Sequence, residues 1–247
     1  MTRIAHSFPM MRRALVLAGI ALAGPALGQG VFELPEGCTA YLTQQQRSCT
    51  VSHHFTCADD PEGWQRRVDL DEEGVIYIGT IDAETRWLES YSPRSGIVEV
   101  LGEDGRDPAS FSTLLATGID RFDFTTRTEP EGVVTRYVGQ DRLTGESVTI
   151  DGVVLERTEF AVTARDESGA ELWRTEGQEF ISREWGMFIG GTRTTTLGDE
   201  SWDSDGSPVE FILPGEPGFL SASPRYDCGA LMSKAPAPGG NGPGGRG

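Results

Sequence analysis

The spacing of the four cysteines constrains the fold of this chain more than any other feature of its sequence. Cys38, Cys49 and Cys57 lie within one short segment, whereas Cys228 lies close to the other end of the chain. Four cysteines in an exported chain usually form two disulfides, and three pairings are possible. A disulfide from the cluster to Cys228 would join the beginning of the folded domain to its end.

One of the three pairings is disfavoured by geometry. The segment from Cys49 to Cys57 has the pattern of a single strand, which at this length spans roughly 27 Å. A disulfide requires Cα atoms within about 7 Å of each other. We therefore expect no Cys49–Cys57 bridge. Of the two other schemes, Cys38–Cys49 with Cys57–Cys228 is preferred, and Cys38–Cys57 with Cys49–Cys228 stays open.

Residues 1–28 have the pattern of a signal peptide. Arg3, Arg12 and Arg13 precede an apolar run that starts at Ala14, and small residues follow at 26–28. The run is shorter than the roughly 20 residues of a membrane-spanning helix, and no other stretch approaches that length. The sequence therefore predicts a soluble exported protein without a membrane span, in a bacterial periplasm or outside the cell.

The charge of the chain restricts its partners. The formal net charge is −17, and because residues 1–28 hold three arginines and no acid, their removal takes it to −20. Such a surface repels nucleic acid, so no nucleic-acid partner is expected. Residues 29–233 are expected to form one β-rich domain. Residues 234–247, rich in glycine and proline, are expected to be a disordered tail.

Most of the domain alternates between short apolar strands and tight turns. The alternation predicts strands over 49–57, 64–70, 75–81, 85–91, 97–101, 119–127, 133–139, 171–182, 185–196 and 208–213. Because the connections are short, neighbouring strands can pair only in antiparallel fashion. The sequence thus predicts a mainly β fold, either a single curved antiparallel sheet or a half-open β-barrel, with one or two short helices and two disulfides.

The dipeptide Asp151-Gly152 gives the clearest local signal. Asp-Gly supplies the two positive φ angles of a two-residue hairpin turn. Such a turn places Ile150 opposite Val153 and Val148 opposite Leu155.

The second strand of this hairpin changes the parity of its apolar residues. Leu155 is at an odd position, whereas Phe160 and Val162 are at even positions. A shift of one residue moves every side chain to the other face, so we expect a β-bulge near residues 156–157.

A short helix is predicted between the strands 97–101 and 119–127. Asp107 is a suitable N-cap, Pro108 fits the first helical position, and Gly118 can end the helix. A second helix is a weaker expectation for residues 38–48, which contain three consecutive glutamines.

Motifs of known chemistry are few. The sequence has no Gly-x-Ser-x-Gly, no glycine-rich phosphate loop, no His-Glu-x-x-His and no Cys-x-x-Cys, so no cofactor is expected. His53 and His54 are adjacent on a strand and should point to opposite faces, one toward the interior and one toward water. Asp199, Asp203 and Asp205 are weak candidates for a loose metal site.

The favoured function is a non-enzymatic binding or carrier protein for an apolar or lipid-like molecule, held between sheet and helix. Half-open barrels that carry lipids or lipoproteins have a compatible topology, as do closed barrels of the lipocalin kind. The alternatives are an interaction module for an envelope protein, and a hydrolase or metal-dependent enzyme that uses His53 or the acids at 199–205. The apolar residues expected to line the ligand cavity are Trp87, Tyr91, Phe111, Leu114, Leu115, Phe122 and Phe124.

Overall fold

The structure, a computed structural model, describes residues 30–229. The predicted signal peptide, residues 1–28, and the predicted tail, residues 234–247, lie outside these residues. In chain order the elements are β1 (Cys38–Gln46), β2 (Thr50–Cys57), β3 (Gln65–Asp71), β4 (Gly74–Ile81), β5 (Trp87–Ser92), β6 (Ile97–Leu101), α1 (Phe111–Thr117), β7 (Ile119–Glu129), β8 (Val134–Ile150), β9 (Val153–Arg165), β10 (Glu171–Ser182), β11 (Met187–Leu197), β12 (Glu200–Asp205) and β13 (Pro208–Ile212).

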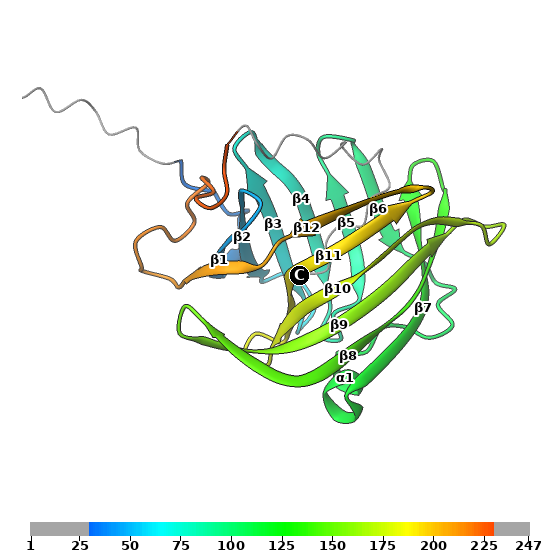
Figure 1. The fold of residues 1–247 in the computed structure, drawn as a ribbon. Coiled ribbons are helices and arrows are strands. Elements are labelled where there is room, and N and C mark those ends of the chain that lie inside the picture. Colours follow the sequence, from blue (N-terminus) through cyan, green and yellow to red (C-terminus); the bar gives the residue numbers. More distant parts are fainter. Residues whose placement is uncertain (1–29, 230–247) are drawn as a thin grey trace, which may run out of the picture.

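All of these strands belong to one open antiparallel sheet. From β1 to β12 each strand pairs with its neighbour in sequence, and β13 returns to pair with β1. Only residues 206 and 207 separate β12 from β13, so the ends of the two edge strands lie together. The sheet therefore curls around on itself, and β10 to β12 pass in front of β3 to β6 in Figure 1. The predicted curved antiparallel sheet is confirmed.

The hairpin at Asp151-Gly152 is formed as predicted. Asp151 and Gly152 have φ angles of 49° and 80°. Ile150 pairs with Val153, and Val148 pairs with Leu155. The turn type alone was sufficient to set this register.

The predicted irregularity lies in the same hairpin, but on the other strand. The β8–β9 register shifts between Leu143, which is opposite Thr158, and Ser147, which is opposite Glu156. Three residues of β8, 144–146, therefore stand opposite one residue of β9, 157, and the extra residues belong to β8. Leu155 and Phe160 are nevertheless both buried, as their change of parity required.

Helix α1 ends as predicted but begins later. Its N-cap is Ser110, whose Oγ accepts the backbone N–H of Thr113 at 3.2 Å. The predicted N-cap, Asp107, instead exchanges two backbone hydrogen bonds with Asp123 of β7, so the chain is still extended there. Gly118 ends the helix with a φ of 82°, a left-handed conformation that glycine adopts without strain.

The two disulfides are Cys38–Cys57 and Cys49–Cys228. The exclusion of Cys49–Cys57 is confirmed, but the preferred scheme is wrong. β1 and β2 form a hairpin in which Cys38 lies directly opposite Cys57, with their Cα atoms 3.9 Å apart. Cys49 lies in the turn at the other end of this hairpin, and is therefore out of reach of Cys38.

The possible helix over 38–48 is also wrong, because these residues form β1 and the turn after it. Gln44 and Gln45 are fully buried within the strand. The Gln45 amide is satisfied there by the backbone of a distant segment, donating to Ser223 O at 3.2 Å and accepting from Arg225 N at 3.0 Å. Partners so far away in the sequence cannot be predicted from the residues around Gln45.

Strand β12 was not predicted. Its sequence, Glu-Ser-Trp-Asp-Ser-Asp, has few residues that favour strands, and its Asp and Ser residues favour turns. It pairs with β11 over its whole length, from Glu200 to Asp205. Charged residues are typical of edge strands, where they discourage pairing with other chains.

Two terminal segments cover the outer face of β1 to β3. We call residues 214–228 the C-terminal strap and residues 30–34 the N-terminal arm. The arm and strap exchange backbone hydrogen bonds, from Phe32 N to Leu220 O and from Ala222 N to Gly30 O, both 2.7 Å. Beneath them lies a cluster of buried apolar residues, Ala40, Val51, Phe55, Val68 and Leu70.

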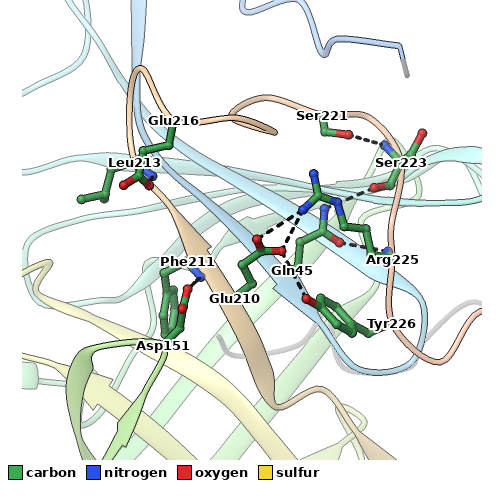
Figure 2. A network of polar contacts seen from close by, with 10 residues as sticks. All are labelled: Gln45, Asp151, Glu210, Phe211, Leu213, Glu216, Ser221, Ser223, Arg225 and Tyr226. Atoms are coloured by element: carbon green, nitrogen blue, oxygen red, sulfur yellow. Dashed lines mark hydrogen bonds and ion pairs between the residues drawn. The ribbon is translucent and has the colours of Figure 1, made fainter. Parts of the chain in front are cut away.

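Polar contacts hold the strap to both β1 and β13, as Figure 2 shows. Gln45 of β1 holds the strap backbone at Ser223 and Arg225. The Arg225 guanidinium forms an ion pair with Glu210 of β13 at 2.9 Å, and Tyr226 donates to the same carboxylate at 3.3 Å. The strap therefore reinforces the pairing of the first strand with the last.

Among the described residues, no helix is both long and apolar enough to cross a bilayer.

Candidate functional site

A cavity of about 60 Å³ lies inside the curled sheet, next to the start of α1. Its walls come from strands β2, β3, β4, β5, β7, β8 and β11 and from the segment leading into the helix. The apolar side chains that line it are Ile81, Trp87, Ala109, Phe111, Phe124, Met187 and Phe188. The polar and charged side chains are His54, Gln65, Arg66, Arg67, Tyr77, Thr85, Asp120 and Asp141.

Two buried carboxyl groups face each other on one wall of the cavity. Asp120 of β7 and Asp141 of β8 are directly opposite in the ladder, and are only 5% and 1% exposed. Asp120 also accepts the backbone N–H of Ser110 at 2.9 Å, which ties the helix N-cap to this wall. Like charges directly opposite each other destabilise a sheet unless another group compensates them.

His54 of β2 projects into the same cavity. It is 3% exposed, and its Nε2 atom has no hydrogen-bond partner among the described residues. Burial holds the pKa of His54 well below its usual value, and the nearby charge of Arg67 lowers it further. The imidazole is therefore neutral at pH 7.

Both arginines on the cavity wall have carboxylates beside them. Arg67 Nε lies 3.1 Å from Asp69, and its guanidinium stacks over the Tyr77 ring at 4.9 Å from the centroid. Arg66 donates two hydrogen bonds to Asp60, at 2.6 and 2.7 Å. This contact holds the pKa of the Asp60 carboxyl below its usual range.

Aromatic rings close the cavity at two sides. Trp87 packs edge-on against Phe124, with ring centroids 5.8 Å apart. On the helix side, Phe111 of α1 packs edge-on against Phe188 of β11 at 5.6 Å. Helix α1 therefore forms part of the cavity wall through Phe111.

The residues predicted to line a ligand cavity fall into two groups. Trp87, Phe111 and Phe124 line the observed cavity. The other four do not: Tyr91 is 37% exposed, Phe122 and Leu114 lie in the packed core, and Leu115 packs at its border. The β4–β5 register shifts between Thr80 and Ile81, and Ile81 is the residue that pairs with Trp87. This irregularity lies between Trp87 and Tyr91 and separates their side chains.

His53 lies on the opposite side of the sheet from His54, as predicted, but it does not face water. It is fully buried beneath the N-terminal arm, stacked on Phe32 at 5.2 Å. Its Nδ1 atom lies 2.9 Å from Thr43 Oγ1, and burial lowers the pKa of His53 to about 4. His53 has no access to the cavity.

The three acids considered for a metal site are not brought together as one site. Asp203 accepts from Thr194 Oγ1 at 2.6 Å, Asp205 lies 3.7 Å from Arg47, and Asp199 is exposed between β11 and β12. Within residues 30–229, the one group of potential ligands close enough for a metal is Cys49, Glu72 and Cys228. Both of its cysteines are already joined in a disulfide.

Sequence reasoning missed the acids of the cavity, although a signal was present. Asp120 has the parity of Phe122 and Phe124, and Asp141 has the parity of Tyr137. An acid in register with buried aromatic residues on an alternating strand must itself lie on the buried face. Buried carboxyl groups are uncommon without a partner or a function, so such positions are informative.

Comparisons with protein-family models, with curated proteins and with solved structures found no match to this chain.

Proposed function

We propose that this protein is an exported, non-enzymatic binding protein that holds a small, partly apolar molecule in the interior cavity. Export, to a bacterial periplasm or to the outside of the cell, is supported by the leader-like residues 1–28. It is also supported by the two disulfides, which are typical of oxidising compartments.

The observation that carries the proposal is a cavity with an aromatic wall and a few convergent polar groups. This combination is the usual composition of small-molecule sites, where apolar walls supply affinity and polar groups fix orientation. Trp87, Phe111 and Phe124 provide the apolar part, and His54, Asp120 and Asp141 provide the polar part.

The size of the cavity limits the ligand. A volume of about 60 Å³ holds only a few water-sized groups. A lipid-like ligand with a long acyl chain would require α1 to move outward. In the closed form the cavity suits a compact molecule, such as a small ring with one polar substituent.

Filling the cavity tests the proposal. Ala109 lines it, whereas Ala116 is exposed on α1, so Ala109→Leu and Ala116→Leu add the same volume at a site and at a control position. The probe is cyclopentanol, detected by ligand-observed NMR and titrated against the native full chain. We expect Ala109→Leu to weaken binding at least tenfold and Ala116→Leu to leave it unchanged.

Two results would contradict the proposal. If cyclopentanol does not bind the unaltered protein, the cavity is not a binding site for a molecule of this class. If both leucine variants bind the probe equally well, the probe binds elsewhere. Circular dichroism melts of the two variants establish that each is folded under the conditions of the titration.

A further inference from the structure

We propose that the cavity selects an electrically neutral molecule that carries a hydroxyl group, and that His54 holds this hydroxyl by a hydrogen bond at its Nε2 atom. His54 is then a specificity-determining residue of the site. This inference rests on the proposed function, because it specifies the ligand of the same cavity.

The charged side chains of the cavity wall already have partners within the protein. They are two carboxyl groups and two guanidinium groups, Asp120, Asp141, Arg66 and Arg67. Arg66 donates two hydrogen bonds to Asp60, and Arg67 lies beside Asp69. Asp120 accepts a backbone N–H at the helix N-cap, and Asp141 also interacts within the protein. A charged ligand would therefore lose its hydration on entry without meeting a free opposite charge on the described wall.

His54 is a neutral group of the same wall with an unsatisfied atom. The residue is 3% exposed, and its Nε2 atom has no hydrogen-bond partner among residues 30–229. A buried polar atom left without a partner is costly. Gln65 provides the contrast, because its amide accepts from the Tyr41 hydroxyl at 2.6 Å and donates to Trp185 O at 3.0 Å. The imidazole is therefore the group that a ligand can satisfy.

A hydroxyl is the neutral group that suits the His54 nitrogen in either tautomer. Burial and the charge of Arg67 hold the pKa of His54 well below its usual value, which keeps the imidazole uncharged. The proton of a neutral imidazole lies on Nδ1 or on Nε2, so Nε2 is an acceptor in one tautomer and a donor in the other. A hydroxyl both donates and accepts, so it forms the hydrogen bond in both cases.

Tyr77 supplies a second neutral polar group to the wall. Its ring lies under the Arg67 guanidinium, 4.9 Å from the ring centroid. A Cβ atom at Gly79, which also lines the cavity, would collide with the Tyr77 hydroxyl, so this hydroxyl lies over Gly79. Burial raises the pKa of Tyr77, so the phenol is uncharged at pH 7. Neutral polar groups beside the rings of Trp87 and Phe124 suit a compact, uncharged, partly apolar molecule.

Probes built on one ring separate this inference from the proposed function. They are cyclopentanol, cyclopentane, cyclopentylammonium and cyclopentanecarboxylate, which differ in hydrogen bonding and in charge. A hydroxyl loses its hydrogen bonds to water on entry, so without a partner in the cavity the alcohol would bind more weakly than cyclopentane. We expect the native full chain at pH 7 to bind cyclopentanol at least as tightly as cyclopentane, and to bind each ion about tenfold or more weakly than the alcohol. Ligand-observed NMR gives the dissociation constants.

Replacing His54 tests its role directly. His54→Phe keeps a ring and removes both nitrogen atoms, so the ratio of alcohol to cyclopentane affinity should fall about tenfold while cyclopentane still binds. His54→Gln restores a donor and an acceptor and should recover part of the ratio. His53→Phe is the matched control, because His53 is the neighbouring buried histidine on the opposite face of the sheet, and it should leave the ratio unchanged.

A measurement on the unaltered protein covers the case in which His54→Phe does not fold. With histidine labelled by ¹⁵N, the Nε2 signal of His54 should shift when cyclopentanol is added, because a new hydrogen bond forms at this atom. Cyclopentane, which forms no hydrogen bond, should leave the signal nearly in place.

Each contrary outcome overturns a defined part of the argument. If either ion binds as tightly as the alcohol, or cyclopentane binds more tightly, the cavity binds ligands but the inference about a neutral hydroxyl is wrong. The same conclusion follows if folded His54→Phe keeps the ratio of the unaltered protein, or if saturating cyclopentanol leaves the His54 signal unmoved. If cyclopentanol does not bind at all, the proposed function fails as well.

Discussion

The carboxylate of Asp151 accepts the backbone N–H of Phe211 at 2.8 Å, which ties the tip of the β8–β9 hairpin to β13 (Figure 2). The two residues lie on opposite halves of the curled sheet. β13 is an edge strand, and Phe211 is paired with Gln44 of β1 on one side. The Asp151 side chain thus accepts a backbone N–H of the edge strand β13, and this hydrogen bond joins the β8–β9 hairpin to the far edge of the curled sheet.

Replacing Asp151 tests this contact. Asp151→Ala removes the acceptor and also places alanine at a φ of 49°, so we expect a loss of about 1–2 kcal/mol in the free energy of unfolding. Asp151→Asn keeps an acceptor oxygen and tolerates the left-handed conformation, so it should lose markedly less. Urea denaturation of the three proteins measures the difference. Equal losses in both variants would show that the hydrogen bond contributes nothing.

The two disulfides should differ in their contribution to stability. Cys49–Cys228 closes a loop with a sequence separation of 179, and Cys38–Cys57 one of 19. On the chain-entropy model these are worth about 5 and about 3 kcal/mol. Removing both cysteines of the long pair should therefore lower the melting temperature more than removing both of the short pair. The opposite order would mean that the strap adds little to the fold.

Acidification should destabilise the protein before its carboxyl groups titrate. In the folded state the pKa of His53 is lowered from 6.5 to about 4, and that of His54 is also lowered. The unfolded chain therefore takes up more protons than the folded protein as the pH falls below about 6.5. His53 alone should reduce the free energy of unfolding by about 2 kcal/mol between pH 7.5 and pH 5.

Urea denaturation at the two pH values measures this effect, and His53→Gln should flatten the dependence. Asp60, Asp123 and Glu156 have lowered pKa values, so their contributions are lost only at more acid pH. Burial raises the pKa of Glu99, so protonation of Glu99 stabilises the folded protein as the pH falls and opposes the effect of the histidines. The comparison with His53→Gln, and not the pH dependence of the unaltered protein alone, is therefore the test. An identical slope in His53→Gln would rule out His53 as its source.

Gly139 is predicted to be intolerant of any side chain. A Cβ atom there would collide with the backbone oxygen of Ala161 and lie 2.5 Å from the ring of Phe122. Gly139→Ala should therefore cost about 1–3 kcal/mol in the free energy of unfolding. Gly105→Ala is the matched control, since its Cβ would meet nothing nearer than 3.8 Å. Thermal melts of the two variants should differ clearly, and similar melts would show that β8 and β9 separate easily.

Local rules predicted the parts of this fold that depend on local structure. The strand 171–182 was predicted with both of its ends, because apolar alternation and flanking turns mark it. The Asp151-Gly152 hairpin was predicted with its register, because the turn determines the pairing. The helix end at Gly118 followed from one residue with a special φ angle.

The features that were missed depend on partners far away in the sequence. Strand β12 is a strand because β11 is beside it, not because its residues favour one. Gln45 of β1 is buried with its amide hydrogen-bonded to the strap, which comes from the other end of the chain. The cavity is lined by residues of β2, β8 and α1, which are far apart in the sequence. That Asp120 and Asp141 line a cavity could therefore not be predicted without knowing how the sheet curls.

The pairing of Cys49 with Cys228 has a consequence for the order in which the chain matures. During synthesis Cys38, Cys49 and Cys57 emerge together, long before Cys228. If oxidation simply joined successive cysteines, Cys38 would pair with Cys49, and Cys57 would be left for the last one. The native arrangement requires Cys38 to pair with Cys57 rather than with its nearest neighbour, and requires Cys49 to be available when Cys228 reaches it. Biogenesis of this protein therefore depends on hairpin formation preceding oxidation, or on a thiol-exchange catalyst that corrects the early bond.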